Sequence, residues 1–430
     1  MEWQQLLMEN TALINAQVVQ IGLEREGQRV TVTGHLADTA LSPTLISELS
    51  GLQRDFAETQ LELVTQPQAS AVAALHALTM LTQQVRQRLL PELIWPLSMP
   101  PTLPREDRDI PIAKLDAAAV AYRQGLAHRY GRRRQMLSGV HCNVSLAASL
   151  MMGLYQAQTD SRDFTTFQNH CYLHIAQNYL HYRWLLTYLY GCSPCCWPQS
   201  GLTPPAQPVR SLRNSSSGYT NRPGVTVSYA SLNDYCQTLQ AAVDNGKLSA
   251  TKEFYGQVRL RHAGGHSQLC QDGIQYLELR NLDLNPWAGA GIDLSQLTCL
   301  TWFVLLMLWL PVPASTDNWI QAGQHANEQV AIETPMQVTR QLTEGEQLAD
   351  ALQTMATSLH QPHALQVAQH ILTSLHDPAN TLAARWEQQT NDSLERATQL
   401  ALQLARHHIL MLEYTEIGVH TCWHVRTHIG

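Results

Sequence analysis

The sequence predicts an α+β fold in which helices cover an antiparallel sheet. Strand-like segments precede a long helical region, and no regular β-α-β alternation connects them. Within these segments apolar and polar residues alternate, which is typical of a sheet with one buried and one open face. The chain has 430 residues, 44% of them hydrophobic, so it is long and apolar enough for a large core, and bulk disorder is excluded.

The first half of the chain is expected to contain two strands, a helix, a proline-rich loop and three further helices. The strands, joined tightly at Gly27, cover 18–26 and 28–34. Helical spacing of apolar residues predicts a helix over 69–90. Six prolines between positions 91 and 111 indicate an extended loop. The further helices are expected at 115–130, 145–159 and 169–190.

The second half opens with a segment rich in Pro, Ser and Gly, 191–224, which predicts a loop. A helix at 231–243 and strands at 255–260 and 274–279 follow. The apolar run from Leu297 to Leu310 stops at Pro311 and is too short to cross a bilayer, so it predicts a buried helix. From Leu342 to about Glu413 the chain is expected to be helical with a polar face.

Charge and cysteine content narrow the class of protein. The chain carries 28 basic and 35 acidic side chains, and a net charge of −7 is unfavourable for binding nucleic acid. Its first residues lack the pattern of a secretory signal. Nine cysteines in a chain of this length do not indicate a disulfide framework. We therefore expect a cytoplasmic protein with mostly reduced thiols and no nucleic-acid or membrane partner.

Three strand-like segments place acidic side chains on an open face. Glu24 and Glu26 share one face of their segment, opposite Leu23, and Glu62 likewise faces away from its leucine neighbours. Two carboxylates side by side repel each other unless a cation lies between them, and such oxygen ligands suit Mg²⁺ or Mn²⁺. The alternative for each segment alone is an ordinary solvated strand face.

The third segment, 274–280, adds a basic residue. Glu278 and Arg280 share a face there. An Arg beside a metal-type Glu is expected where a transferring phosphoryl group is held, and a local ion pair is the alternative. Ser138–Asn143 is expected to be a tight turn that carries His141 and Asn143, although a lone His is usually structural. Arg213 lies in a polar loop and is suited to bidentate contact with a substrate carboxylate.

A Cys192-x₂-Cys195 pair has a spacing suggestive of zinc, but a structural site needs further ligands that the sequence does not show. Seven further motifs point together to one family. In chain order they are GLEREGQRV (22–30), DFAETQLELVT (55–65), WPLSMP (95–100), YRQGLAHRYG (122–131), SGVHCNVS (138–145), SLRNSSSGYTN (211–221) and YLELRNLDLNPW (276–287). Together these motifs resemble bacterial glutamate–cysteine ligase of the proteobacterial type, also called γ-glutamylcysteine synthetase.

The resemblance is clear over about 20–290 and fainter beyond. It implies a glutamine-synthetase-like α+β fold, with a curved antiparallel sheet that forms a funnel surrounded by helices. We expect one catalytic domain over 1–430, with the sheet in about 15–290 and a mainly helical part in about 291–415. The metal ligands of the family match Glu24, Glu26, Asp55, Glu62, His141 and Glu278.

The resemblance also implies the substrate contacts. Arg280 matches the Arg beside the transferring phosphate, Arg213 matches the Arg that meets substrate, and Glu278 serves catalysis as a metal ligand. The acceptor pocket matches Phe56, Tyr122, Leu126, Tyr219 and Tyr255, and Asn143 is a further substrate-binding candidate.

The implied reaction joins the γ-carboxylate of L-glutamate to the amine of L-cysteine. ATP and Mg²⁺ (or Mn²⁺) take part, a γ-glutamyl phosphate is the intermediate, and a separate glutathione synthetase is expected to use the product. Two alternatives stay open. Cys142 and the segment 214–217 depart from the family pattern, which leaves room for a ligase with another amine acceptor. A non-catalytic relative that binds ATP or glutamate is the other.

Overall fold

The computed structural model describes residues 3–159, 162–218 and 220–410. Within them seven antiparallel strands form a sheet in the order β2-β3-β1-β5-β7-β6, and β4 pairs with β1 beside this path. The α+β class with an antiparallel sheet is thereby confirmed. The strands are β1 (Val19–Val30), β2 (Leu52–Arg54), β3 (Gln60–Val64), β4 (Leu93–Ile94), β5 (Val140–Leu146), β6 (Val258–Arg261) and β7 (Tyr276–Leu282).

Several helices begin at a side chain that caps the first turn. Ser70, Asp116 and Ser231, for example, each accept a hydrogen bond from the backbone N–H three residues further on. In the first half the helices are α1 (Trp3–Glu9), α2 (Pro43–Glu48), α3 (Ala71–Leu89), α4 (Ala117–Tyr130), α5 (Ala148–Ala157), α6 (Phe164–Tyr182) and α7 (Trp184–Tyr190), with short 3₁₀ turns η1 (Thr11–Leu13), η2 (Asp107–Asp109) and η3 (Arg133–Met136).

The second half adds a larger set of helices. They are α8 (Leu232–Asp244), α9 (His266–Asp272), α10 (Leu294–Trp309), α11 (Thr316–Ala331), α12 (Leu342–Ser358), α13 (Pro362–His376), α14 (Leu382–Thr390) and α15 (Leu394–Leu410), with η4 (Thr251–Glu253) and η5 (Pro378–Asn380). The predicted helical tail is therefore present to Leu410, and the last residues of that prediction, 411–413, lie outside the described residues.

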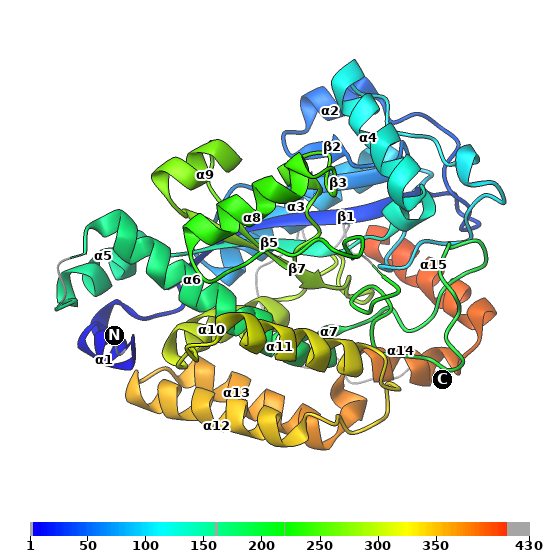
Figure 1. Ribbon diagram of the computed structural model, residues 1–430. Coiled ribbons are helices and arrows are strands. Elements are labelled where there is room, and N and C mark those ends of the chain that lie inside the picture. Colours follow the sequence, from blue (N-terminus) through cyan, green and yellow to red (C-terminus); the bar gives the residue numbers. More distant parts are fainter. Residues whose placement is uncertain (1–2, 160–161, 219, 411–430) are drawn as a thin grey trace.

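One set of helices covers one face of the sheet in layers, whereas α2 and α4 lie apart from these layers (Figure 1). Helices α3, α6 and α7 contact the strands, α10 packs against α3 and α6, and the α12–α13 pair lies further out. The predicted buried helix is confirmed as α10, which starts at a capping box between Asp293 and Gln296. No described helix is long and apolar enough to cross a membrane. The main hydrophobic core includes side chains from Trp3 near the N-terminus to Leu375 in α13, so residues far apart in the sequence pack into the same core.

The prediction of two short strands joined at Gly27 is wrong, because β1 is one strand through that residue. Gly27 stays in the ladder opposite Leu61. A Cβ at this position would lie 3.0 Å from Arg25 Nη1 and 3.1 Å from Ile94 Cγ2. Here glycine provides room for two neighbouring side chains rather than a turn.

The predicted tight turn over 138–143 is also wrong, since residues from Val140 onward form β5 between β1 and β7. Gly139 is not a turn residue either. A Cβ there would lie 2.2 Å from Arg213 Nη2, so its glycine lets an arginine side chain approach the backbone. Because β5 includes Ser145 and Leu146, the following helix starts later than the sequence suggested.

Candidate active site

Strand register brings the acidic side chains together on the open face of the sheet. Glu24 on β1 pairs with His141 on β5, and Glu26 on β1 pairs with Glu62 on β3. On the other side of β5, Asn143 pairs with Glu278 of β7. The leucines that alternate with these residues are fully buried in the main core. Four strands therefore direct polar side chains toward one point.

Three of these side chains form a compact donor set. Ligand atoms of Glu24, His141 and Glu278 all lie within 4.8 Å of one another. The two nitrogens of the His141 ring face carboxylates, with Nδ1 3.3 Å from Glu24 Oε2 and Nε2 3.6 Å from Glu26 Oε1. Asn143 Nδ2 donates to Glu24 Oε1 over 2.7 Å. Asn143 therefore orients a candidate ligand in this structure.

A cavity of about 180 Å³ lies beside this donor set. Its acidic wall holds Glu26, Asp55 and Glu62, and another part of its lining is apolar and aromatic, from Phe56, Tyr122, Leu126, Leu137 and Tyr255. A larger cavity of about 550 Å³ lies between α1, α6 and the end of α10, but none of its described lining residues is acidic. The acidic lining therefore favours the smaller cavity as the candidate active site.

The carboxylates that line the cavity resist ionisation. Burial, together with the charge of Asp55, raises the pKa of Glu26 to about 8. Burial raises the pKa of Asp55 to about 6, although Arg123 and Arg280 act in the opposite direction. Burial and the neighbouring acids hold the pKa of Glu62 well above its usual range. A divalent cation between these groups would remove the mutual repulsion.

The compact donor set has the protonation states that a metal requires. Burial opposes ionisation of Glu24 and Glu278, but the His141 hydrogen bond lowers the pKa of Glu24, and Arg259 and Arg280 lower that of Glu278. Burial and the charge of Arg280 lower the pKa of His141 to about 4, so its imidazole is neutral. Carboxylates and a neutral imidazole are suitable ligands for a divalent cation.

The sequence model of the family described as Glutamate-cysteine ligase matches residues 5–249 and 244–330. The chain belongs to this family. It is 39% identical over 394 residues to the Glutathione biosynthesis bifunctional protein GshAB of Enterococcus faecalis. The matched region covers 90% of this chain and 52% of that protein. It is 36% identical over 423 residues to the protein of the same name from Pasteurella multocida, covering 95% and 55%. The chain thus spans about half the length of these relatives.

Solved structures agree with the fold. A bifunctional glutathione synthetase from Pasteurella multocida superimposes with a TM-score of 0.86 at 35% identity, over 95% of this chain and 55% of that one. A glutamate–cysteine ligase from Francisella tularensis, in complex with AMP, superimposes with a TM-score of 0.82 over 93% and 90%. At 22% identity the second comparison shows the fold alone. The expected α+β, glutamine-synthetase-like class is confirmed for this member of the glutamate–cysteine ligase family.

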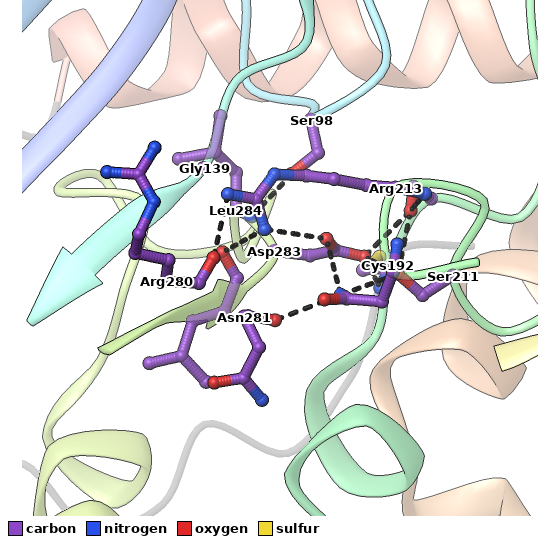
Figure 2. Close-up of polar contacts among 12 residues, drawn as sticks. Ser98, Gly139, Cys192, Ser211, Arg213, Arg280, Asn281, Asp283 and Leu284 are labelled. Atoms are coloured by element: carbon purple, nitrogen blue, oxygen red, sulfur yellow. Dashed lines mark hydrogen bonds and ion pairs between the residues drawn. The ribbon is translucent and has the colours of Figure 1, made fainter. Parts of the chain in front are cut away.

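In this family member Arg213 is used largely by the protein itself (Figure 2). Its side chain is 5% exposed, and it donates to Leu282 O over 3.2 Å and to Arg280 O over 3.0 Å. It is not among the residues that line the cavity, but its charge lowers the pKa of Glu26. Arg213 therefore lies directly behind the acidic wall. Tyr219, also expected at the acceptor pocket, lies outside the described residues.

Sequence reasoning missed the residue that holds the Arg213 segment in place. Buried Asp283, at the end of β7, accepts hydrogen bonds from Cys192 N, Ser193 Oγ and Ser211 Oγ over 2.7–2.9 Å. Asn214 Nδ2 adds a contact of 3.3 Å. Asp283 stands inside the YLELRNLDLNPW motif, but alternation along a strand gives it no special role.

Cations on the cavity wall were missed as well. Arg123 from α4, Lys252 from η4 and Arg259 from β6 all line the cavity with Arg280. Arg259 Nη1 lies 3.6 Å from Glu278 Oε1, and Arg261 Nε lies 3.2 Å from Glu278 Oε2. Arg280 Nη1 makes a closer pair with the same carboxylate. The basic side chains thus balance the charge of Glu278, and the pKa values of Glu26, Asp55 and Glu62 stay raised despite them.

Proposed function

We propose that this chain joins the γ-carboxylate of L-glutamate to the amine of L-cysteine, consuming ATP through a γ-glutamyl phosphate in the first step of glutathione biosynthesis. The observation that carries the proposal is the convergence of five carboxylates and a neutral imidazole beside a cavity with aromatic and cationic walls. Membership of the glutamate–cysteine ligase family and its relatives in glutathione biosynthesis support it. ATP is then a substrate.

The proposed ligands for Mg²⁺ (or Mn²⁺) are Glu24, Glu26, Asp55, Glu62, His141 and Glu278. Bound divalent ions would shield the negative charges of the triphosphate and the attacking carboxylate, which otherwise repel each other. Arg280, next to Glu278, would stabilise charge that develops on the transferring phosphoryl group. Arg213 would add positive charge behind Glu26, and Asn143 would keep Glu24 in its binding orientation.

The acceptor would occupy the aromatic side of the cavity, near Phe56, Tyr122, Leu126 and Tyr255, with Tyr219 in the same proposed pocket. Cys142 gives no reason to expect another acceptor, because it is fully buried in the main core and does not line the cavity. Cysteine therefore stays the proposed acceptor. We also propose a cytoplasmic location and a separate glutathione synthetase that uses the product.

The proposal is tested with the full chain, MgCl₂, ATP, L-glutamate and a panel of amines. ADP and γ-glutamylcysteine are expected only when both amino acids are present, with a clear preference for cysteine. Preference for another amine would make the chain a ligase of different specificity. Absence of ADP with every acceptor, and of phosphate release in a single turnover at saturating substrates, would indicate a non-catalytic relative.

Magnesium binding should depend on pH because Glu26 holds a proton near neutrality. Its pKa of about 8 means that Mg²⁺ and this proton compete below pH 8, so the loss of this one proton should contribute a rise in apparent Mg²⁺ affinity of up to about tenfold per pH unit in that range. Calorimetric titration at several pH values measures this, and Glu26→Gln should flatten the slope. An equally steep slope in the variant would contradict the assignment.

The proton on Glu26 also determines whether the free energy of unfolding rises or falls with pH. Between pH 4.5 and about 8 the metal-free folded chain holds it while the unfolded chain does not. The contribution of Glu26 to the free energy of unfolding therefore falls as pH rises through this range. Added Mg²⁺ should oppose that loss, so the increase in Tm on adding Mg²⁺ should be larger at pH 8 than at pH 6.

Lys252 is the best-placed cation for the acceptor carboxylate. Arg259 donates to Phe254 O and Lys252 O, and Arg123 donates to Asp55 O over 2.7 Å. The Lys252 ammonium lies 4.0 Å from the centre of the Tyr122 ring, and the described residues provide it with no ion-pair partner. The turn that carries it is fixed, because buried Glu253 pairs with Arg129 over 2.6 Å.

We predict that Lys252→Met raises KM for L-cysteine by about tenfold, the value of a lost charge-assisted contact. KM for ATP and kcat should change little. Cysteamine, which lacks the carboxylate, should be used equally well by both forms. Lys247→Met is the matched control, because Lys247 is exposed and contacts only Gly224 O among the described residues. Equal losses with cysteine and cysteamine would refute the role.

A further inference from the structure

Two cysteines and a histidine meet on neighbouring helices outside the catalytic cavity. Cys236 lies on α8, whereas His266 and Cys270 lie one turn apart on α9, and the two helices pack against each other (Figure 1). Cys236 and Cys270 form a disulfide in this structure. The Cys270 sulfur lies 3.7 Å from His266 Nε2, and ligand atoms of all three residues lie within 4.8 Å.

These two sulfurs differ from the other described cysteines. The six free cysteines are buried or, in the case of Cys195, half-buried. Cys270 is exposed and Cys236 is half-buried, so solvent and small thiols reach this pair. His266 is placed on the same helix face as Cys270 by its four-residue spacing.

We propose that the reduced form of this site binds one thiophilic divalent cation, of the Zn²⁺ class, through Cys236, His266 and Cys270. Two thiolates and an imidazole are the donor set that zinc prefers. In a tetrahedral site with Zn–S bonds of about 2.3 Å the two sulfurs lie about 3.8 Å apart, so they must move apart once the disulfide opens, within reach of side-chain rotation on the two neighbouring helices. Burial lowers the pKa of His266, which keeps the imidazole neutral for coordination.

The fourth position would be open to solvent. His266 also lines a cavity of about 170 Å³ between α8, α9 and β6, which provides space for a water ligand. The disulfide is the metal-free state of the site. Low-molecular-weight thiols reduce the disulfide: two of them supply two electrons and become a disulfide, and the Cys236–Cys270 bond breaks to give two protein thiols. These two thiols release two protons when the cation binds.

The test uses the full chain, reduced with a phosphine, freed of reductant without oxygen, and titrated with Co²⁺ in excess Mg²⁺. We expect one equivalent of Co²⁺ with thiolate-to-cobalt charge-transfer absorption, displaced by Zn²⁺ and absent from the oxidised protein. The carboxylate site cannot produce this band because it has no thiolate. No band in the reduced chain, or the same band in the oxidised chain, would overturn the proposal.

Variants assign the ligands. Cys236→Ser and Cys270→Ser should each abolish the band, whereas Cys195→Ser, a thiol on another surface, should retain it. His266→Gln should weaken Zn²⁺ binding at least about tenfold and still form the disulfide on oxidation, which shows that its fold is intact. Wild-type affinity in His266→Gln, or a band that survives either serine variant, would refute the site.

Discussion

Glu278→Gln is expected to lower kcat/KM by about 10²–10³-fold while the chain still folds. The amide keeps the shape of the side chain and leaves the β7 backbone paired with β5 and β6. It removes one charge from a proposed metal ligand, and it leaves Arg259, Arg261 and Arg280 facing a neutral group. Mg²⁺ should therefore bind more weakly, and the repulsion between the two anionic substrates should no longer be shielded.

Steady-state rates at several Mg²⁺ concentrations measure the effect, and circular dichroism confirms the fold. Excess Mg²⁺ should restore only part of the activity, because Glu278 also positions Arg280. Glu346→Gln is the matched control, since Glu346 is an exposed acid paired with His376 over 3.2 Å. Normal turnover and unchanged Mg²⁺ dependence in Glu278→Gln would show that Glu278 is not a metal ligand.

The acidic half of the site was predictable from the sequence because strand alternation is a local rule. Glu24, Glu62 and Glu278 each stand next to leucines that must be buried, so their side chains had to face the other way. The resemblance then joined segments that local rules cannot connect. Which strands are neighbours depends on register across the sheet, and the pairing of Glu24 with His141 appears only in the structure.

The basic half was not predictable in the same way. Lys252 lies on a short 3₁₀ turn, and its place at the cavity depends on Glu253, whose partner Arg129 is 124 residues away. Arg213 was predicted to meet substrate, but its immediate surroundings depend on Gly139 and Asp283, which lie in other segments. Cys236 and Cys270 are 34 residues apart, so no local spacing marks them as a pair.

The differences between the predicted and the observed fold concern two glycines and one polar helix. Gly27 and Gly139 signal turns by their type, yet each serves a close approach by an arginine side chain. Helix α11 lies in the part of the chain expected to be mainly helical, but it was not predicted as a separate element because its residues are mostly polar and only one stripe, including Ala326 and Val330, is buried. Its position comes from contacts with α6 and α7, which are tertiary information.

Arg280→Lys is expected to lower kcat by about 10²-fold even though the positive charge is kept. The guanidinium contacts Glu278 through Nη1, lines the cavity, and lowers the pKa of both Asp55 and His141. A lysine ammonium is a single point of charge, so it cannot hold Glu278 and a phosphoryl oxygen in two fixed directions at once. Rates measured at saturating ATP separate this effect from weaker nucleotide binding.

We expect the Arg280→Lys variant to lose turnover without losing the stability of its fold. Arg280 contributes its backbone, not its side chain, to the sheet and to Arg213: its N–H donates to Gln257 O over 3.0 Å, and its carbonyl accepts from Arg213. Those bonds persist in a lysine variant, so Tm should stay close to wild type. Arg88→Lys, at an exposed ion pair with Glu48, is the matched control and should keep full activity. Near-normal turnover in Arg280→Lys would mean that a point charge suffices and that the planar group does not hold phosphate.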